Sequence, residues 1–378
     1  MLATAEVYQL VHNTKANNAL AGNLLPTNNN PSILDLEGFT SLTVVDDDPK
    51  GAVPVAFGLY NTYTPSQVYC SVIASTDKYD GLFVNIEPVK IKAHQLGVTE
   101  ESAEQHAAYK IKNVISELPN LNSYPQYYRA FAEPIARPLH QCIVDELIAL
   151  TVGERNYDMK RNTTVDLYDK NSKFVCCDRS EQNFICSMKE QSDEMWRDYS
   201  GFMVSDKHRL SEFEIKKSNL LSILNEFLDE KNILSEGVQF VALSPRTASL
   251  FIDYDQNLSI VDRQTYLEYL FSLQGVNGIV ALDAEQQPIG YVLSLGDRVL
   301  QCYADNLDIA NSLLREHVQS MKADCIKLFA AAHDQSIFNE LTKKSEIVRR
   351  VRRFHSRIVP SNVKWTQIFM FNIGVHLF

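Results

Sequence analysis

The sequence predicts an α/β protein with a mixed sheet, arranged as two halves of similar element order. Its 378 residues are enough for two domains of ~150 residues, and 45% hydrophobic with 22% charged residues is a globular composition. Strand-like runs alternate with helical patterns, which favours a helix-covered sheet over a bundle. Two short matches, Ile135 with Ile309 and Leu167 with Leu341, share an offset of 174 positions (309 − 135), as an internal duplication would produce.

The first half opens with a polar, turn-rich stretch and continues into runs rich in β-branched and aromatic residues. Residues 100–117 show helical spacing, which indicates an inserted helical segment. Pro134 suits a first helical position, because its missing N–H would be unpaired there anyway. We expect strands at 53–60, 67–75, 81–86 and 127–132, helices at 134–150 and around 162–170, and a helical insertion at about 91–125.

The second half follows a charged, amphipathic segment at 205–236 that predicts a helix. We therefore expect an N-terminal domain at 1–204, a helical linker at 205–244 and a C-terminal domain at 245–378. In the C-terminal domain we expect strands at 278–283, 289–295, 299–304, 325–330, 347–358 and 364–375, and helices at 306–321 and 335–344.

Composition and motif content argue against several classes of function. The formal net charge of −11 is unfavourable for a surface that binds nucleic acid or an acidic membrane. The cysteines and histidines lack metal-ligand spacing, and no apolar run reaches the ~18 residues of a membrane span. Without a signal-like N-terminus, we expect a cytoplasmic protein with reduced thiols and no metal, nucleic-acid or membrane partner.

One basic run near the C-terminus departs from the acidic balance of the chain. It is explained either as the solvated face of a folded element or as a nuclear-localisation or phosphate-binding patch, and the interleaved apolar residues favour the first. The run consists of Lys343, Lys344, Arg349, Arg350, Arg352, Arg353 and Arg357.

Short motifs in the C-terminal half point to a known superfamily. The most specific is Tyr303-Ala304-Asp305, followed by Ile309-Ala310 and Leu313-Leu314. With the element order, the motifs resemble the GNAT acyltransferase superfamily, and residues 245–378 resemble its YitH/HolE-type acetyltransferase domain. The resemblance implies two tandem GNAT-like domains. Its other motifs are Asp253-Tyr254-Asp255, Val261-Asp262-Arg263 with Tyr266 and Leu267, Pro288-Ile289-Gly290-Tyr291-Val292, and Arg357-Ile358-Val359-Pro360-Ser361 before Trp365.

The resemblance also implies acetyl-CoA as the cofactor. In GNAT proteins its pyrophosphate lies on backbone N–H groups at a helix start, where the helix dipole favours an anion. The glycines usual there are replaced in both halves of this chain. The cofactor-binding positions that the resemblance assigns to the N-terminal half are Phe131, Pro134, Ile135, Ala136 and Arg137, together with Asn162.

In the C-terminal half, the corresponding positions carry negative charge. Asp305 and Asp308 precede Ala310, and two carboxylates there oppose a pyrophosphate. Asp305 is more simply explained as a helix N-cap. The sequence thus predicts that the C-terminal helix start is not a cofactor site.

The resemblance assigns a catalytic role to Tyr168, within the pattern Asn162, Leu167-Tyr168, Lys170. In GNAT proteins a tyrosine at this position protonates the leaving thiolate of CoA, while a carboxylate or water takes a proton from the amine. Glu87 and Glu133 are the candidate bases. Packing explains Tyr168 equally well, and Glu133 is equally a favourable charge near a helix start.

The sequence leaves two main hypotheses open. The first is an acetyl-CoA-dependent N-acyltransferase acting on a small-molecule amine, with its site in the N-terminal half. The second is a catalytically inactive GNAT-like protein that binds a small ligand or a protein partner, because both copies lack the phosphate-binding glycines. A scaffold that docks another protein is a weaker third hypothesis.

Overall fold

The computed structural model describes parts of both halves of the chain. The residues it describes are 33–48, 51–64, 67–76, 78–79, 82–90, 92, 99–115, 137–152, 162–168, 202–229, 237–259, 261–331, 335–360 and 363–372.

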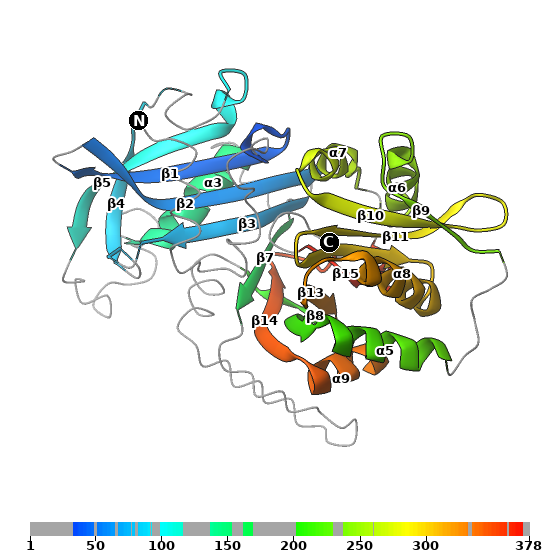
Figure 1. Ribbon diagram of the computed structural model, residues 1–378. Coiled ribbons are helices and arrows are strands. Elements are labelled where there is room, and N and C mark those ends of the chain that lie inside the picture. Colours follow the sequence, from blue (N-terminus) through cyan, green and yellow to red (C-terminus); the bar gives the residue numbers. More distant parts are fainter. Residues whose placement is uncertain are drawn as a thin grey trace.

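These residues form one continuous mixed sheet that runs through both halves (Figure 1). The order of its 15 described strands is β6-β4-β5-β1-β2-β3-β7-β14-β8-β13-β15-β12-β11-β10-β9. Helices lie on both faces of the C-terminal strands, and α3 packs against the N-terminal strands. The predicted α/β class with a mixed sheet is confirmed.

In the N-terminal half, β1, β2 and β3 form an antiparallel meander, and β7 runs parallel to β3. Helix α3 buries Leu139, Ile143 and Leu147 against this sheet. The elements are β1 (Phe39–Asp48), β2 (Gly51–Thr64), β3 (Gln67–Ser75), β4 (Phe83–Pro88), β5 (His106–Ile115), β6 (Arg137–Pro138), α3 (Leu139–Val152) and β7 (Asn162–Tyr168), with 3-10 turns at Ile33–Asp35 and Ala103–Gln105.

Two helices predicted for this half are wrong. The insertion contains the strand β5, which pairs with β1 on one side and β4 on the other. The segment that begins at Asn162 is the strand β7, in which Thr163, Thr164 and Val165 are β-branched and prefer extended backbone. In both segments, hydrogen bonding to two neighbouring strands outweighs local helical spacing.

The helix predicted from residue 205 begins only at Lys217. Residues 204–216 form the long strand β8 (Val204–Lys216), and α5 (Lys217–Asp229) follows. Strand β8 lies between β13 and β14, while β14 also pairs with β7. The two halves therefore share a continuous sheet in which a C-terminal strand, β14, contacts the N-terminal half directly.

The C-terminal half closely follows the predicted order, and this order is the one that resembles the GNAT fold. The parallel pair β12 and β13 is connected through α8, as β3 and β7 are connected through a segment containing α3. The elements are β9 (Gln239–Ala242), α6 (Ala248–Asp255), α7 (Gln264–Ser272), β10 (Val276–Leu282), β11 (Pro288–Leu295), β12 (Arg298–Ala304), α8 (Leu307–Ser320), β13 (Cys325–Ala331), α9 (Gln335–Lys344), β14 (Glu346–His355) and β15 (Ile368–Met370), with a 3-10 turn at Trp365–Gln367.

The offset of 174 residues does not describe the structural repeat. It matches Asn162, in strand β7, with Ser336, in helix α9. It also matches Leu139, the first residue of α3, with Leu313, seven positions into α8. The two halves share the unit of parallel strands and helix, but the short sequence matches lie in different elements.

Alternate residues of the C-terminal strands bury two separate cores. Tyr291, Leu293 and Tyr303 face α6 and α7, whereas Val292 and Cys302 face the core covered by α5, α8 and α9. Gly290 is required by a close approach, because a Cβ there would lie 2.8 Å from the Cα atom of Ala304. This packing fixes the position of the start of α8 against the sheet.

Candidate functional site

The start of α8 is capped by the chain itself. Asn306 is the N-cap, and its side chain accepts a hydrogen bond from the Ile309 N–H at 3.0 Å. The prediction of Asp305 as the cap is therefore wrong by one residue. Asn306 adopts the extended backbone of a cap and its amide oxygen supplies the acceptor.

Asp305 instead joins the helix start to two other elements. Its Oδ1 atom accepts from the Tyr254 hydroxyl at 3.1 Å and from the Gln367 side-chain amide at 3.2 Å. Burial, followed by the nearby Asp305 charge, raises the pKa of Tyr254. The carboxylate predicted to oppose a pyrophosphate is thus held beside α8 by donors from α6 and from the turn before β15.

Strand β15 occupies the space between β12 and β13. The two parallel strands pair with each other at Arg298 and Lys327, and farther along β15 lies between them. Met370 is opposite both Cys302 and Ala330. The side chains of 368–371 are buried, so this part of the C-terminal half is filled by its own chain.

A fully buried polar cluster lies beneath α6 and α7. Arg263 Nε is 3.3 Å from Asp255 Oδ1, and its Nη1 donates to the Tyr303 hydroxyl at 3.4 Å. The guanidinium also lies over the rings of Tyr266 and Tyr303, at 5.5 and 5.4 Å. Burial raises the pKa of Asp255, and the Arg263 charge acts against that rise. A buried ion pair of this kind favours one defined arrangement of its surroundings more than it adds stability.

The residues of this cluster occur in the motifs noted in the sequence, but the sequence alone assigns no role to them. Asp255, Arg263 and Tyr266 belong to the segments that resemble the YitH/HolE-type domain. Their spacing alone does not show that a loop returns Arg263 to the end of α6. An acidic and a basic residue in otherwise apolar helical segments were the available signal.

The helix start in the N-terminal half differs from the prediction. Helix α3 begins at Leu139, and the Leu139 N–H donates to the Leu82 carbonyl at 3.0 Å. Arg137, predicted within the helix, lies in strand β6, which pairs with β4. Because Arg137 and Pro138 pair with β4, the helix begins only at Leu139. Phe131, Glu133, Pro134, Ile135 and Ala136 lie outside the described residues.

The structure does not bring Tyr168 and Glu87 together. Tyr168 lies in β7, opposite Val351 of β14, while Glu87 is in β4. Strand β4 is five strands from β7 in the sheet order, which is about 24 Å at ~4.8 Å per strand. Asn162 begins β7 and pairs with Gln67. Tyr168 and Glu87 therefore cannot act as acid and base on the same substrate atoms.

Glu87 has a sufficient structural explanation in the sheet. Its carboxylate forms ion pairs with Lys110 at 3.1 Å and Lys112 at 3.5 Å, both on the neighbouring strand β5. The hydrogen bond from Lys110 lowers its pKa. A base that must accept a proton near neutral pH needs the opposite shift.

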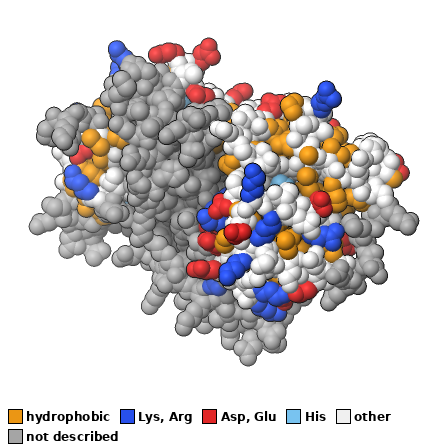
Figure 2. Space-filling view, viewed as in Figure 1, with side chains coloured by type: hydrophobic (Ala, Val, Ile, Leu, Met, Phe, Trp, Pro, Cys, Tyr) orange, Lys and Arg blue, Asp and Glu red, His pale blue; other side chains and the backbone are white. Residues whose placement is uncertain are grey.

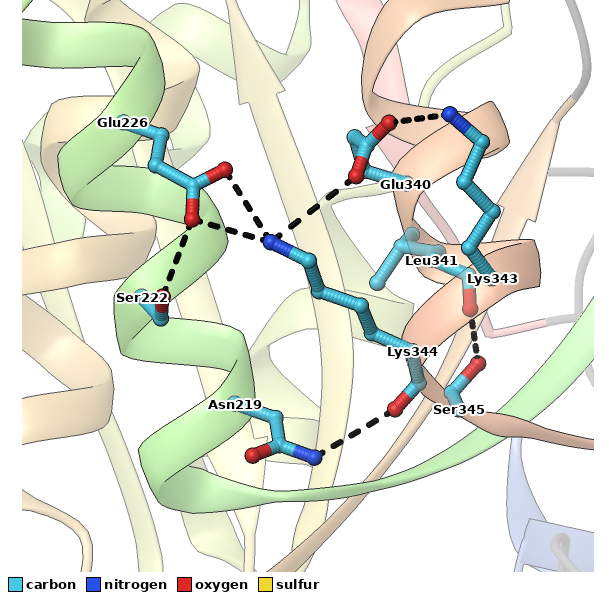
Figure 3. Close-up of polar contacts among 8 residues, drawn as sticks. All are labelled: Asn219, Ser222, Glu226, Glu340, Leu341, Lys343, Lys344 and Ser345. Carbon is cyan, nitrogen blue, oxygen red and sulfur yellow. Dashed lines mark hydrogen bonds and ion pairs between the residues drawn. The ribbon is translucent and has the colours of Figure 1, made fainter.

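The basic run near the C-terminus is divided between ion pairs and the interior. Lys344 bridges Glu226 of α5, at 2.9 Å, and Glu340, at 3.8 Å, while Lys343 pairs with Glu340 (Figure 3). Arg353 is buried between the rings of Tyr69 and Trp365. Figure 2 shows acidic and basic side chains interspersed on the described part of this face. The lysines therefore belong to the contact between α5 and α9, as the solvated-face interpretation predicts.

The C-terminal half does not fit the pyrophosphate of acetyl-CoA. Asp305 and Asp308 place negative charge at the start of α8, where a pyrophosphate would need a positive environment. At the cofactor site predicted for the N-terminal half, the described residues are the end of β6 and the beginning of α3. Within the described residues, no helix is long and apolar enough to cross a membrane, and no group of three His, Cys, Asp or Glu side chains is arranged to hold a metal.

Comparisons with known proteins were made at the level of family, sequence and structure. Residues 26–204 match the family model described as a domain of unknown function, DUF7596. No curated protein sequence matches the chain.

Among solved structures, the chain is similar to a tandem GNAT protein from the clavulanic acid biosynthesis pathway, with a TM-score of 0.43, 10% identity, and coverage of 95% of this chain and 96% of that one. A conserved protein of unknown function from Enterococcus faecalis has a TM-score of 0.43 and 9% identity, with 93% of this chain and 69% of that chain covered. A GCN5-related N-acetyltransferase from Sphaerobacter thermophilus has a TM-score of 0.39 and 9% identity, with 81% of this chain and 78% of that chain covered. At these identities, none of the similarities identifies a substrate or a reaction.

Proposed function

We propose that the protein is an acetyl-CoA-dependent N-acyltransferase of GNAT type in which the N-terminal half holds the cofactor and the C-terminal half, of YitH/HolE type, is a silent copy. The observation that carries this proposal is a difference between the halves. In the C-terminal half, β15 lies between β12 and β13, whereas among the described strands β3 and β7 are direct neighbours. Ligands of α/β sheets bind at the carboxyl ends of parallel strands, beside a helix start.

In this proposal the cofactor contacts lie around Arg137 and the start of α3. The positive end of the helix dipole and the Arg137 charge would favour the phosphates, and acetyl-CoA would supply the acyl group. The acceptor is a small-molecule amine, and Tyr168 remains the candidate acid. Its backbone lies in strand β7, so Tyr168 would act from the sheet and not from a helix.

Thermal unfolding of the full chain with and without acetyl-CoA tests the proposal. Ligand at 100 times Kd adds ~2.7 kcal/mol to the free energy of unfolding, which raises Tm by roughly 3–4 °C when 378 residues unfold together at ~2.1 cal/mol/K per residue. The shift should persist in Asp308→Asn, because Asp308 lies at the silent helix start. A larger shift in Asp308→Asn would place the cofactor in the C-terminal half, because this variant removes a negative charge that opposes the pyrophosphate.

A second candidate is a GNAT-like protein without catalysis, which binds a small ligand or a protein partner. The separation of Tyr168 and Glu87 by five strands favours it, because the predicted acid and base do not meet. Turnover measured with a panel of amines separates the candidates. A loss of tenfold or more in Tyr168→Phe supports the acid role, whereas acetyl-CoA binding without any turnover supports the second candidate.

A further inference from the structure

In the polar cluster under α6 and α7, one hydroxyl donor faces two acceptors. The Tyr291 hydroxyl lies 2.5 Å from Asp255 Oδ2 and 3.0 Å from Gln301 Oε1. A tyrosine hydroxyl has one proton, so it can donate to one of these two acceptors. All three residues are at most 2% exposed, so bulk water does not resolve the conflict.

A half turn of the Gln301 amide removes the conflict. The oxygen and nitrogen of a side-chain amide have nearly the same shape, and the surrounding donors and acceptors decide their positions. In the turned orientation, Gln301 Nε2 donates to the Tyr291 oxygen, and Tyr291 donates to Asp255. Gln301 Nε2 has no hydrogen-bond partner among the described residues in the present orientation. In the turned orientation, Gln301 Oε1 faces the Tyr266 hydroxyl, whose pKa the nearby amide affects. Both ends of the amide gain a complementary partner.

The same order continues to the C-terminal segment. Asn372 Nδ2 lies 3.2 Å from the Tyr266 oxygen and donates to it, so the Tyr266 proton can point to Gln301. Asn372 lies two residues after β15 (Ile368–Met370), and the N–H of the intervening Phe371 donates to the Phe329 carbonyl at 3.3 Å. At the other end, Asp255 is fixed by the Arg263 guanidinium. Each hydroxyl in this order accepts one hydrogen bond and donates one.

We propose that these groups form a one-way hydrogen-bond chain that locks the segment 365–372 between β12 and β13 and so keeps the C-terminal half closed to ligands. The proposal rests on the silent C-terminal half proposed above and names the contact that closes it. Chains of hydrogen bonds strengthen one another, so loss of one link weakens the others. From first donor to final acceptor, the order is Asn372, Tyr266, Gln301, Tyr291 and Asp255.

Hydrogen exchange of the backbone amides of 368–372, measured on the full chain, tests the lock. Tyr291→Phe removes the central hydroxyl without touching β15, and it should speed their exchange about tenfold, as the loss of one buried hydrogen bond would. Tyr303→Phe is the matched control, because it also loses one buried hydrogen bond, which its hydroxyl accepts from Arg263 outside the chain. Its effect on 368–372 should stay within about twofold of its effect on the other sheet amides, whereas Tyr291→Phe should act selectively on 368–372. Equal exchange in Tyr291→Phe and the unmodified protein would overturn the proposal.

A double-mutant cycle of Asn372→Ala with Tyr291→Phe gives an independent test if a single variant folds poorly. The two residues have no direct contact in this chain of bonds, so their effects on the unfolding equilibrium should multiply unless the chain couples them. We expect a coupling factor of at least about threefold, whereas independent sites stay within about twofold. A protonated-carboxyl infrared band that disappears in Asp255→Asn would overturn the donor order. Acetyl-CoA binding is a separate readout, so failure of the lock leaves the proposed cofactor half to be judged by its own experiment.

Discussion

Acidification from pH 7 to pH 5 should destabilise the protein through the buried His317. Its Nε2 atom lies 2.7 Å from the Ser294 hydroxyl, and the side chain is 1% exposed. Burial lowers the pKa of His317 from 6.5 to about 4. The folded protein therefore keeps this imidazole neutral while the unfolded chain binds a proton.

The size of the effect follows from the two pKa values. Above pH 6.5 both states are neutral and the contribution does not change with pH. Between pH 6.5 and 4 the unfolded state binds more protons than the folded state, so stability decreases as the pH is lowered. The loss is about 2 kcal/mol at pH 5 and at most ~3.4 kcal/mol below pH 4. Partial opening of the site would reduce these values.

Urea unfolding at pH 7 and pH 5 measures the loss, and His317→Gln is the control because its amide can still reach Ser294 without titrating. Other groups, including the buried His106, whose pKa is also lowered by burial, titrate in both proteins and cancel in the difference. The unmodified protein should lose about 2 kcal/mol more than the variant. An equal loss in both proteins would refute the argument.

Three further substitutions have effects that denaturant unfolding can measure. Asn306→Ala removes the cap of α8 and should cost ~1 kcal/mol. Gly290→Ala forces a Cβ to 2.8 Å from the Ala304 backbone and should cost about 1–3 kcal/mol, and an unchanged stability would show that β11 and β12 can separate without strain. Asp255→Asn leaves the Arg263 charge buried and should cost ~3–5 kcal/mol, whereas the exposed Asp253→Asn should stay within ~0.5 kcal/mol.

The sequence predicted the C-terminal half well because its elements carry strong local signals. Helix α8 has an apolar face at Ala310, Leu313 and Leu314, and the strands β11 and β12 are mostly apolar runs between turns. The prediction missed α6 and α7 as separate helices. Their eight and nine residues are too short for a clear period.

The errors lie where pairing between distant segments decides the structure. Strand β8 has charged residues at Lys207, Arg209 and Glu212 that suit an exposed helix, yet it lies in the middle of the sheet. Its buried Glu212 is paired with Arg298 of β12 at 2.6 Å. An ion pair between residues 86 positions apart is invisible to a local pattern.

For the candidate site, the sequence predicts that the start of α8 is unsuited to an anion, because charge is a local property. It could not indicate that β15 returns between β12 and β13, since that depends on the path of the whole chain. The prediction of a helix around Tyr168 is wrong for the same reason, because strand β7 is formed by pairing with distant strands. A short motif identifies residues, but their distance to a partner comes from the sheet order.

Hydrogen exchange with and without saturating acetyl-CoA tests the central claim, the division between the two halves, most directly. The account predicts slower exchange in α3 and β3, and unchanged exchange at the start of α8 and in β15. Slower exchange at residues 306–312, with α3 and β3 unchanged, would contradict it, because the cofactor would then lie at the capped, acidic helix start.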